Sequence, residues 1–168
     1  MKFINNSSDL AKFLNIKIIQ KSSISSISTD TRDLKAGSLF FAIKGEQFNG
    51  NDYVEDALKK GASFVVTDSR RFKGNNDKNI IYVNSSVVAL RTIAKNILKT
   101  FNGDVIGITG SNGKTTTTKI ISSVLNKSSG TIKNYNNEIG MPLSIINANA
   151  NSKYLVIEMG AAKPKDIQ

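Results

Sequence analysis

The chain has 168 residues, of which 39% are hydrophobic, and it carries 23 Lys and Arg against 13 Asp and Glu, a net charge of +10. It contains no cysteine and no histidine, which excludes a disulfide framework, a thiolate metal site and histidine as a general base. The basic residues are scattered and Trp is absent, so we expect small anionic substrates, and not nucleic acid, to account for the charge. No signal-peptide core and no run of 18 apolar residues occurs. We therefore expect a cytoplasmic protein without membrane insertion.

The first half of the sequence predicts short elements that are separated by polar turns. A short helix is predicted near residues 8–14, and a second helix at 53–60 with Asp52 as its cap. Residues 70–78 predict a polar loop. The strands predicted in this half are residues 24–29, 38–43, 63–67 and 79–83.

A longer helix is predicted at 86–100, and we expect it to join two domains. Its apolar residues recur on one face, namely Val87, Leu90, Ile93, Ala94, Ile97 and Leu98. We accordingly divide the chain into an N-terminal domain at 1–84, a connecting helix at 85–102 and the first part of a second domain at 103–168.

Beyond this helix the pattern becomes strand, loop and helix, which is typical of α/β nucleotide-binding domains. The predicted elements are strands at 104–109, 130–132 and 154–158 and helices at 114–125 and 141–147. We expect an α/β fold in which a small mixed N-terminal domain precedes the start of a P-loop NTPase-like parallel domain. A parallel sheet needs both of its faces covered, and these few elements cannot supply that. We therefore expect the second domain to be truncated and the chain to be part of a longer enzyme.

The turn after the strand at 104–109 reads Gly110-Ser111-Asn112-Gly113-Lys114-Thr115-Thr116. Backbone N–H groups of such a loop surround phosphate oxygens, and a helix that begins there directs its positive end at the anion. Lys114 can place its charge between the β and γ phosphates of ATP, and the Thr115 hydroxyl can coordinate Mg²⁺. The longer phosphate-loop pattern has a Gly where this chain has Ile108, so this is a shortened variant. The alternative is a Gly-rich turn with a chance Lys, which the flanking strand and helix disfavour.

Glu158 ends the apolar strand at 154–158. The carboxyl ends of strands in such sheets line the ligand crevice, so Glu158 is expected beside the phosphate loop, where it can hold Mg²⁺ directly or through water. The alternative is a Glu that caps the turn at 159–161.

Several motifs together resemble the Mur ligases, a family of ATP-dependent amide ligases of cell-wall synthesis. They follow one another in the family's order and span nearly the whole chain. They are Asp30-Thr31-Arg32, Gly37-Ser38-Leu39-Phe40-Phe41-Ala42-Ile43-Lys44-Gly45-Glu46, Thr109 to Thr116, Asn136-Asn137-Glu138-Ile139-Gly140-Met141-Pro142-Leu143 and Ile157-Glu158-Met159-Gly160-Ala161.

The resemblance implies a role for each matching position. Lys114 and Glu158 are implied as catalytic residues, and Thr115 and Glu158 as Mg²⁺ ligands. The residues implied to contact ATP are Gly110, Ser111, Asn112, Gly113, Lys114, Thr115, Thr116, Asn137 and Glu138. The residues implied to contact the UDP part of the substrate are Thr31, Arg32, Glu46, Gln47 and Phe48. For Asp30 and Arg32 the alternative is an ion pair that stabilises a local turn.

The Asn136 segment resembles the branch of the family that joins D-alanyl-D-alanine to UDP-N-acetylmuramoyl-tripeptide through an acyl phosphate. Two positions depart from the family pattern: Asn51 stands where His is frequent, and Ala162 where Asn or Ser is common. We expect a monomer that lacks ligase turnover by itself, because the family places further catalytic groups beyond the part matched here. The alternatives are a ligase of the same superfamily that adds a diamino acid or glutamate, a non-catalytic module that binds UDP-muropeptide, and a basic nucleic-acid binder.

Overall fold

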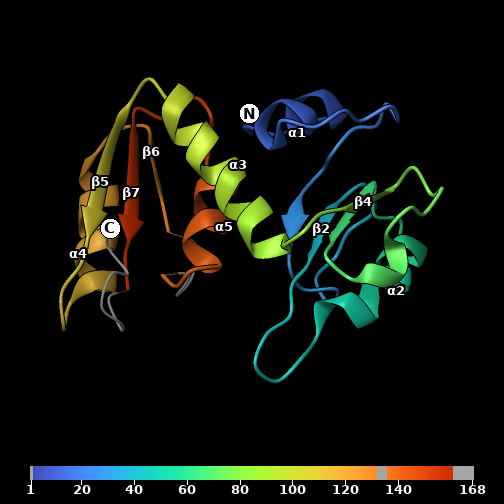
Figure 1. Ribbon diagram of the computed structural model, residues 1–168. Helices are drawn as coiled ribbons and strands as arrows, with labels where there is room; N and C mark the ends of the chain where they lie inside the picture. Colours follow the sequence, from blue (N-terminus) through green and yellow to red (C-terminus); the bar gives the residue numbers. More distant parts are fainter. Residues whose placement is uncertain (1, 132–135, 161–168) are drawn as a thin grey trace. The chain divides into compact units, whose positions relative to one another are not determined.

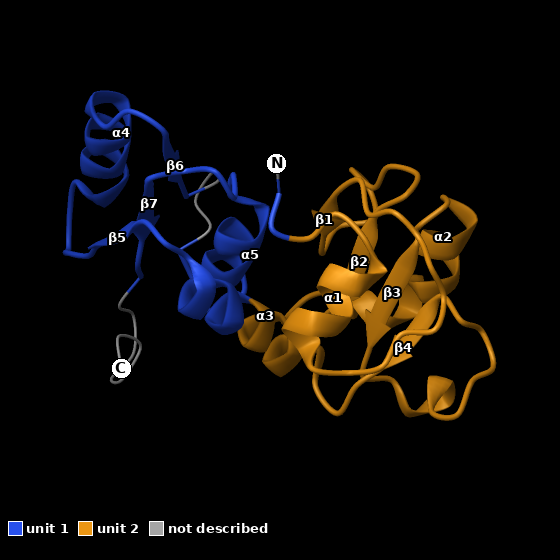
Figure 2. Ribbon diagram, turned by 90° about the horizontal axis from the view of Figure 1, so that it is seen from above, with its two compact units in different colours: residues 1–3, 94–168 blue, residues 4–93 orange. Residues whose placement is uncertain are grey.

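The computed structural model describes residues 2–131 and 136–160, which form two compact units (Figures 1 and 2). One unit is Ile4–Ile93, and the other is Met1–Phe3 with Ala94–Gln168. Both contain a parallel sheet and helices, which confirms the predicted α/β class. The division falls within a helix, and the domain limits 1–84, 85–102 and 103–168 stay a prediction. Within the described ranges, no helix is both long and apolar enough to cross a bilayer.

The unit Ile4–Ile93 contains a four-stranded sheet in the order β1-β2-β3-β4. Its strands are β1 (Ile27–Ser28), β2 (Leu39–Ala42), β3 (Phe64–Thr67) and β4 (Ile80–Tyr82). Every neighbouring pair is parallel, so all four carboxyl ends lie at one edge. Every residue of β2 and β3 is buried, as expected for inner strands of a covered parallel sheet.

The strand predicted at 24–29 is much shorter in the structure. The Ile24 N–H donates to the Asn5 carbonyl at 2.8 Å, and the Ser25 N–H donates to the Gly37 carbonyl at 2.8 Å. These bonds hold the segment before β1, and only Ile27 and Ser28 enter the ladder. Alternation of side chains could not reveal that the backbone had other partners.

The helices of this unit are α1 (Ser7–Leu14), the 3₁₀ turn η1 (Gly50–Tyr53), α2 (Val54–Lys59) and the 3₁₀ turn η2 (Arg70–Phe72). The predicted cap at Asp52 is wrong. Asp52 lies inside η1, whose own cap is Asn49, and α2 has no side-chain cap. The loop predicted at 70–78 contains η2. One face of the sheet is covered by a buried cluster of Phe40, Ala42, Val54, Ala57, Ala62, Val65 and Phe72.

Helix α3 (Ser86–Thr100) has the predicted bounds, and the division of the chain into the two units falls within it, between Ile93 and Ala94. Of the six residues on its predicted apolar face, Leu90, Ile93, Ala94 and Ile97 are buried, whereas Val87 and Leu98 are half-buried. Ala89 is also buried, because the covered face is wider than the apolar stripe in the sequence.

Ser86 presents a testable feature at the start of α3. Its side chain is fully buried, and its Oγ has no hydrogen-bond partner among the residues that the structure describes. Replacing it by alanine removes an unsatisfied polar group, so Ser86→Ala is expected to raise the free energy of unfolding by about 1 kcal/mol. Urea denaturation measures this. The control is Ser85→Ala, which removes the hydroxyl that accepts from the Val88 N–H at 3.3 Å and should lower stability by about 1 kcal/mol. A loss in Ser86→Ala as large as in the control would contradict the prediction.

The second unit is a three-stranded parallel sheet in the order β5-β7-β6. Its elements are β5 (Asp104–Ile108), α4 (Lys114–Val124), β6 (Ser128–Gly130), α5 (Gly140–Asn147) and β7 (Tyr154–Glu158). Strand β6 begins two residues before the predicted strand at 130–132, of which Ile132 lies outside the described residues. Leu155, Val156 and Ile157 of β7 are buried, as their apolar run predicted.

Candidate functional site

A glycine-rich loop joins the end of β5 to the start of α4. Gly110 and Gly113 have positive φ angles of 149° and 77°, which side chains with a Cβ rarely adopt. The left-handed Gly113 turns the chain directly into α4, which has no side-chain cap. The first N–H groups of a helix have no acceptor within the helix. In α4 these groups come shortly after Ser111 and Asn112, which are exposed. The loop therefore has the geometry of an anion site at a helix N-terminus.

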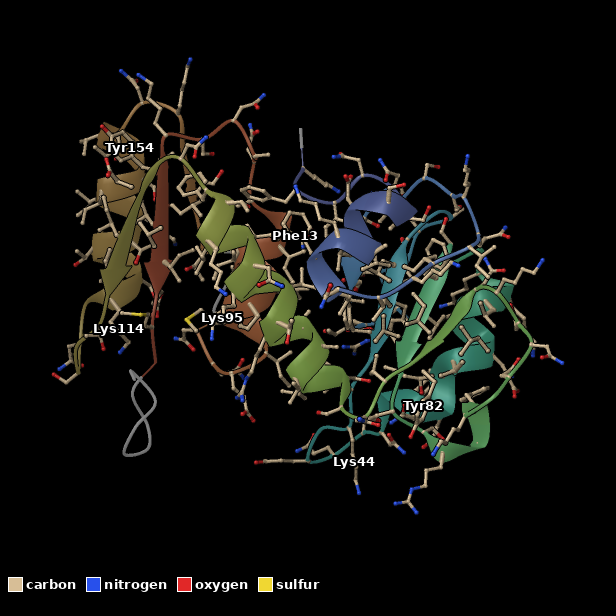
Figure 3. The ribbon with its side chains drawn as sticks, turned by 45° about the horizontal axis from the view of Figure 1, so that its top comes forward. Phe13, Lys44, Tyr82, Lys95, Lys114 and Tyr154 are labelled. Carbon is tan, nitrogen blue, oxygen red and sulfur yellow. The ribbon has the colours of Figure 1, made fainter. Side chains whose placement is uncertain are left out.

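Lys114 folds back over this loop. Its Nζ donates to the Gly110 carbonyl oxygen at 2.7 Å, so the ammonium group lies across the turn. Figure 3 shows Lys114 at the loop end of the sheet, with Tyr154 at the opposite end. An anion at this loop would therefore lie within reach of the ammonium group.

Glu158 is the last residue of β7 and only 2% exposed. It pairs in register with Ile108, the residue at which β5 ends, so the prediction that it lies beside the loop is confirmed. Its Oε2 accepts from the Thr115 hydroxyl at 2.9 Å, and its Oε1 accepts from the Asn136 side-chain amide at 2.8 Å. The alternative role as a cap of the 159–161 turn partly falls outside the described residues.

Thr115 and Glu158 provide the hard oxygen donors that Mg²⁺ prefers. The Thr115 Oγ1 and the Glu158 Oε2 are 2.9 Å apart. In the part of the chain that the structure describes, no group of three or more His, Cys, Asp or Glu side chains is placed to hold a metal. Mg²⁺ at nucleotide sites usually takes one or two protein ligands together with phosphates and water. These two residues could therefore hold Mg²⁺ beside a phosphate.

Two contacts of Glu158 were not among the predicted site residues. One is Asn136, which belongs to the Asn136–Leu143 motif but has no predicted role there. The other is Thr131, whose Oγ1 accepts from the Glu158 N–H at 2.7 Å. Thr131 follows β6 directly, so its place at the carboxyl end of a strand was the signal that could have identified it. The predicted Asn137 lies before α5, and its Oδ1 accepts from the Ile139 and Gly140 N–H groups at 3.2 and 2.7 Å. The predicted Glu138 is exposed.

The residues predicted to contact UDP follow β1 and β2, whose carboxyl ends share one edge of the first sheet. Residues 46–48 are exposed, and Phe48 is 70% exposed. Arg32 is bound to Asp30, with its Nη2 2.6 Å from Oδ2, so the predicted local ion pair is present. The hydrogen bond to Asp30, and then charge attraction to it, raises the pKa of Arg32 above its ordinary value. Thr31 is half-buried, and its carbonyl accepts from Lys60 Nζ at 2.7 Å.

Two family models match successive parts of the chain. The model described as "Mur ligase family, catalytic domain" matches residues 23–101, and the "Mur ligase middle domain" matches residues 108–167.

Individual relatives agree with these matches. The chain is 39% identical over 157 residues to the UDP-N-acetylmuramoyl-tripeptide–D-alanyl-D-alanine ligase of Buchnera aphidicola. This match covers 92% of this chain and 34% of that protein. It is 37% identical over 150 residues to the ligase of the same name from Bacillus subtilis, covering 86% and 32%.

Among solved structures, the MurF ligase of Thermotoga maritima in complex with ADP is 36% identical, with a TM-score of 0.74. The match covers 84% of this chain and 33% of that one. The chain thus spans about a third of the length of the relatives it matches. With a phosphate-type loop, a buried Glu beside it and two consecutive family matches, the chain belongs to the Mur ligase family, of which it contains the N-terminal and middle-domain parts.

Proposed function

We propose that the chain supplies the uridine-nucleotide and ATP-phosphate sites of a ligase that joins D-alanyl-D-alanine to UDP-N-acetylmuramoyl-tripeptide in the cytoplasm. The observation that carries the proposal is the contact between Thr115 and the buried Glu158, at 2.9 Å, beside a loop that Lys114 crosses. The names of the relatives, and the ADP in one of their structures, support the choice of substrates.

At the ATP end, the backbone of 110–116 surrounds the phosphates, and Lys114 exchanges the Gly110 carbonyl for a phosphate oxygen. Thr115 and Glu158 would hold Mg²⁺, which would supply positive charge where negative charge develops. Glu158 is kept in place by the Asn136 amide at its other oxygen. Asn137 and Glu138 lie in the segment that follows Asn136, and we assign them to the nucleotide side of the site.

The proposed reaction proceeds in two steps. The terminal carboxylate of the tripeptide attacks the γ-phosphoryl group of ATP, and an acyl phosphate forms as ADP leaves. The amine of D-alanyl-D-alanine then attacks the activated carbonyl, and phosphate leaves. The share of this chain is to position the phosphoryl group and to balance its charge.

At the uridine end, Thr31, Arg32 and the exposed segment 46–48 lie after neighbouring parallel strands, and ligands of open α/β sheets bind at that edge. Phe48 offers an exposed ring on which uracil can stack. Calorimetric titration with UDP-N-acetylmuramoyl-tripeptide is expected to give saturable binding at one site. A folded chain that gives no binding heat at millimolar ligand would contradict the uridine assignment.

Turnover is expected to be absent in this chain by itself, because it matches only a third of the ligases. The measurement is phosphate release with Mg-ATP and UDP-N-acetylmuramoyl-tripeptide, with D-alanyl-D-alanine or diaminopimelate as the amine. Release that depends on D-alanyl-D-alanine would contradict the expected inactivity, and release that depends on diaminopimelate would contradict the substrate assignment.

A further inference from the structure

Asn51 is a buried polar residue, 8% exposed, and the two residues after it, Asp52 and Tyr53, are exposed. Its side-chain Oδ1 accepts from the Thr67 hydroxyl at 2.6 Å. Its Nδ2 donates to Asp68 Oδ1 at 2.9 Å and to Asn49 Oδ1 at 3.2 Å. The amide is thus directed inward and paired on both of its ends, which marks a role in holding the surrounding backbone rather than a ligand contact of its own.

Asp68 extends these contacts to a third element. Its second oxygen, Oδ2, accepts from the Ser86 N–H at 3.0 Å, at the first residue of α3. The four side chains of Asn49, Asn51, Thr67 and Asp68 form what we term the Asn51 network. It joins the start of η1 to the end of β3 and to the start of α3, all within the unit Ile4–Ile93.

The hairpin at 43–50 is connected to the Asn51 network at its carboxyl end. The Gly45 N–H donates to the Phe48 carbonyl at 2.8 Å, and the Gly50 N–H donates to the Ile43 carbonyl at 2.9 Å. Gly50 packs so closely that a Cβ there would lie 2.6 Å from the Ile43 nitrogen. The hairpin extends from the end of β2, and Figure 3 shows Lys44 on it. The tip of the hairpin at 46–48 is exposed to solvent. The direction of the hairpin is therefore fixed by β2 before it and by the Asn51 network after it.

We propose that Asn51 and Asp68 are positioning residues for nucleotide binding, which hold the hairpin at 43–50 so that its tip meets a uridine diphosphate. This rests on the proposed function of the uridine site. A two-stranded ladder of this length is marginal by itself, and a ligand that had to order it would lose affinity to that ordering. The Asn51 network orders the hairpin before the nucleotide arrives.

The test compares Asn51→Ala with Ser38→Ala. Ser38 is fully buried in the same unit, and its hydroxyl bonds the Ser26 hydroxyl and the Lys35 carbonyl, away from the hairpin. We expect Asn51→Ala to weaken binding of UDP about tenfold, because ordering a few side chains and a short loop costs that order of affinity. We also expect faster amide hydrogen exchange at 44–50. Ser38→Ala is expected to lose comparable global stability while keeping UDP affinity and exchange at 44–50.

A second variant acts through the other member of the pair. Asp68→Asn places an NH₂ donor opposite the donors of Asn51 or Ser86, so it is expected to shift affinity and exchange in the same direction. Equal loss of affinity in Ser38→Ala, or unchanged affinity in Asn51→Ala, would overturn the proposal. If the unaltered chain binds no UDP, the proposed function fails and the nucleotide half of this inference fails with it. Exchange at 44–50 then decides separately whether Asn51 holds the hairpin.

Discussion

Replacing Glu158 by alanine is expected to lower the free energy of unfolding by about 2–3 kcal/mol, since it leaves two donors in a buried site without their acceptor. The donors are the Thr115 hydroxyl and the Asn136 amide, and the carboxylate that they bind is only 2% exposed. The same change is expected to abolish any strengthening of ADP binding by Mg²⁺. Urea denaturation measures the first effect, and calorimetric titration with and without Mg²⁺ measures the second.

Two further variants separate these effects. Glu158→Gln keeps the shape and one acceptor oxygen, so its stability loss is expected to be smaller while the Mg²⁺ effect is still lost. Asp104→Asn removes an exposed carboxylate at the other end of β5 and should change neither quantity. A Glu158→Gln chain that kept the full Mg²⁺ effect would refute the metal role of Glu158.

Lys114→Ala is expected to weaken ATP binding about tenfold to a hundredfold, because a hydrogen bond to a charged group contributes about 1.5–3 kcal/mol. The ammonium group now lies 2.7 Å from the Gly110 carbonyl, across the loop that would hold the phosphates. The matched control is Lys119→Ala, which removes an exposed lysine from the same helix. Calorimetric affinities for Mg-ATP provide the comparison.

The comparison of the two lysine variants shows whether Lys114 acts through its place at the loop or only through its positive charge. If both variants lost affinity equally, the contribution of Lys114 would be only that of the overall positive charge. Lys114→Arg adds a further comparison, since it keeps the charge but changes the shape of the donor. It should recover only part of the affinity, because an ammonium group fits between phosphates as a compact charge.

Much of the fold followed from local patterns in the sequence. Helix α3 was predicted with its observed bounds because its apolar residues recur at helical spacing. The loop at 110–116 was predicted from its glycines and Lys114, and the strand before it and the helix after it are both present. The place of Glu158 followed from a general rule about the carboxyl ends of parallel strands, which the pairing of Ile108 with Glu158 satisfies.

Contacts between distant residues could not be predicted in this way. Asn136 and Glu158 are 22 residues apart, and Asn51 and Asp68 are 17 apart, so no local spacing marks either pair. The prediction that Asp52 caps a helix was wrong for a related reason. The 3₁₀ turn η1 precedes α2, so Asn49 caps η1 and α2 has no side-chain cap. A helical period alone does not show where such a turn ends and an α-helix begins.

The most direct test of the nucleotide assignment is a calorimetric titration of the unaltered chain with ADP, in the presence and absence of Mg²⁺. We predict saturable binding at one site that is tighter with Mg²⁺, as the loop at 110–116 and the adjacent Thr115 and Glu158 require. A folded chain with no saturable binding under either condition would contradict the account.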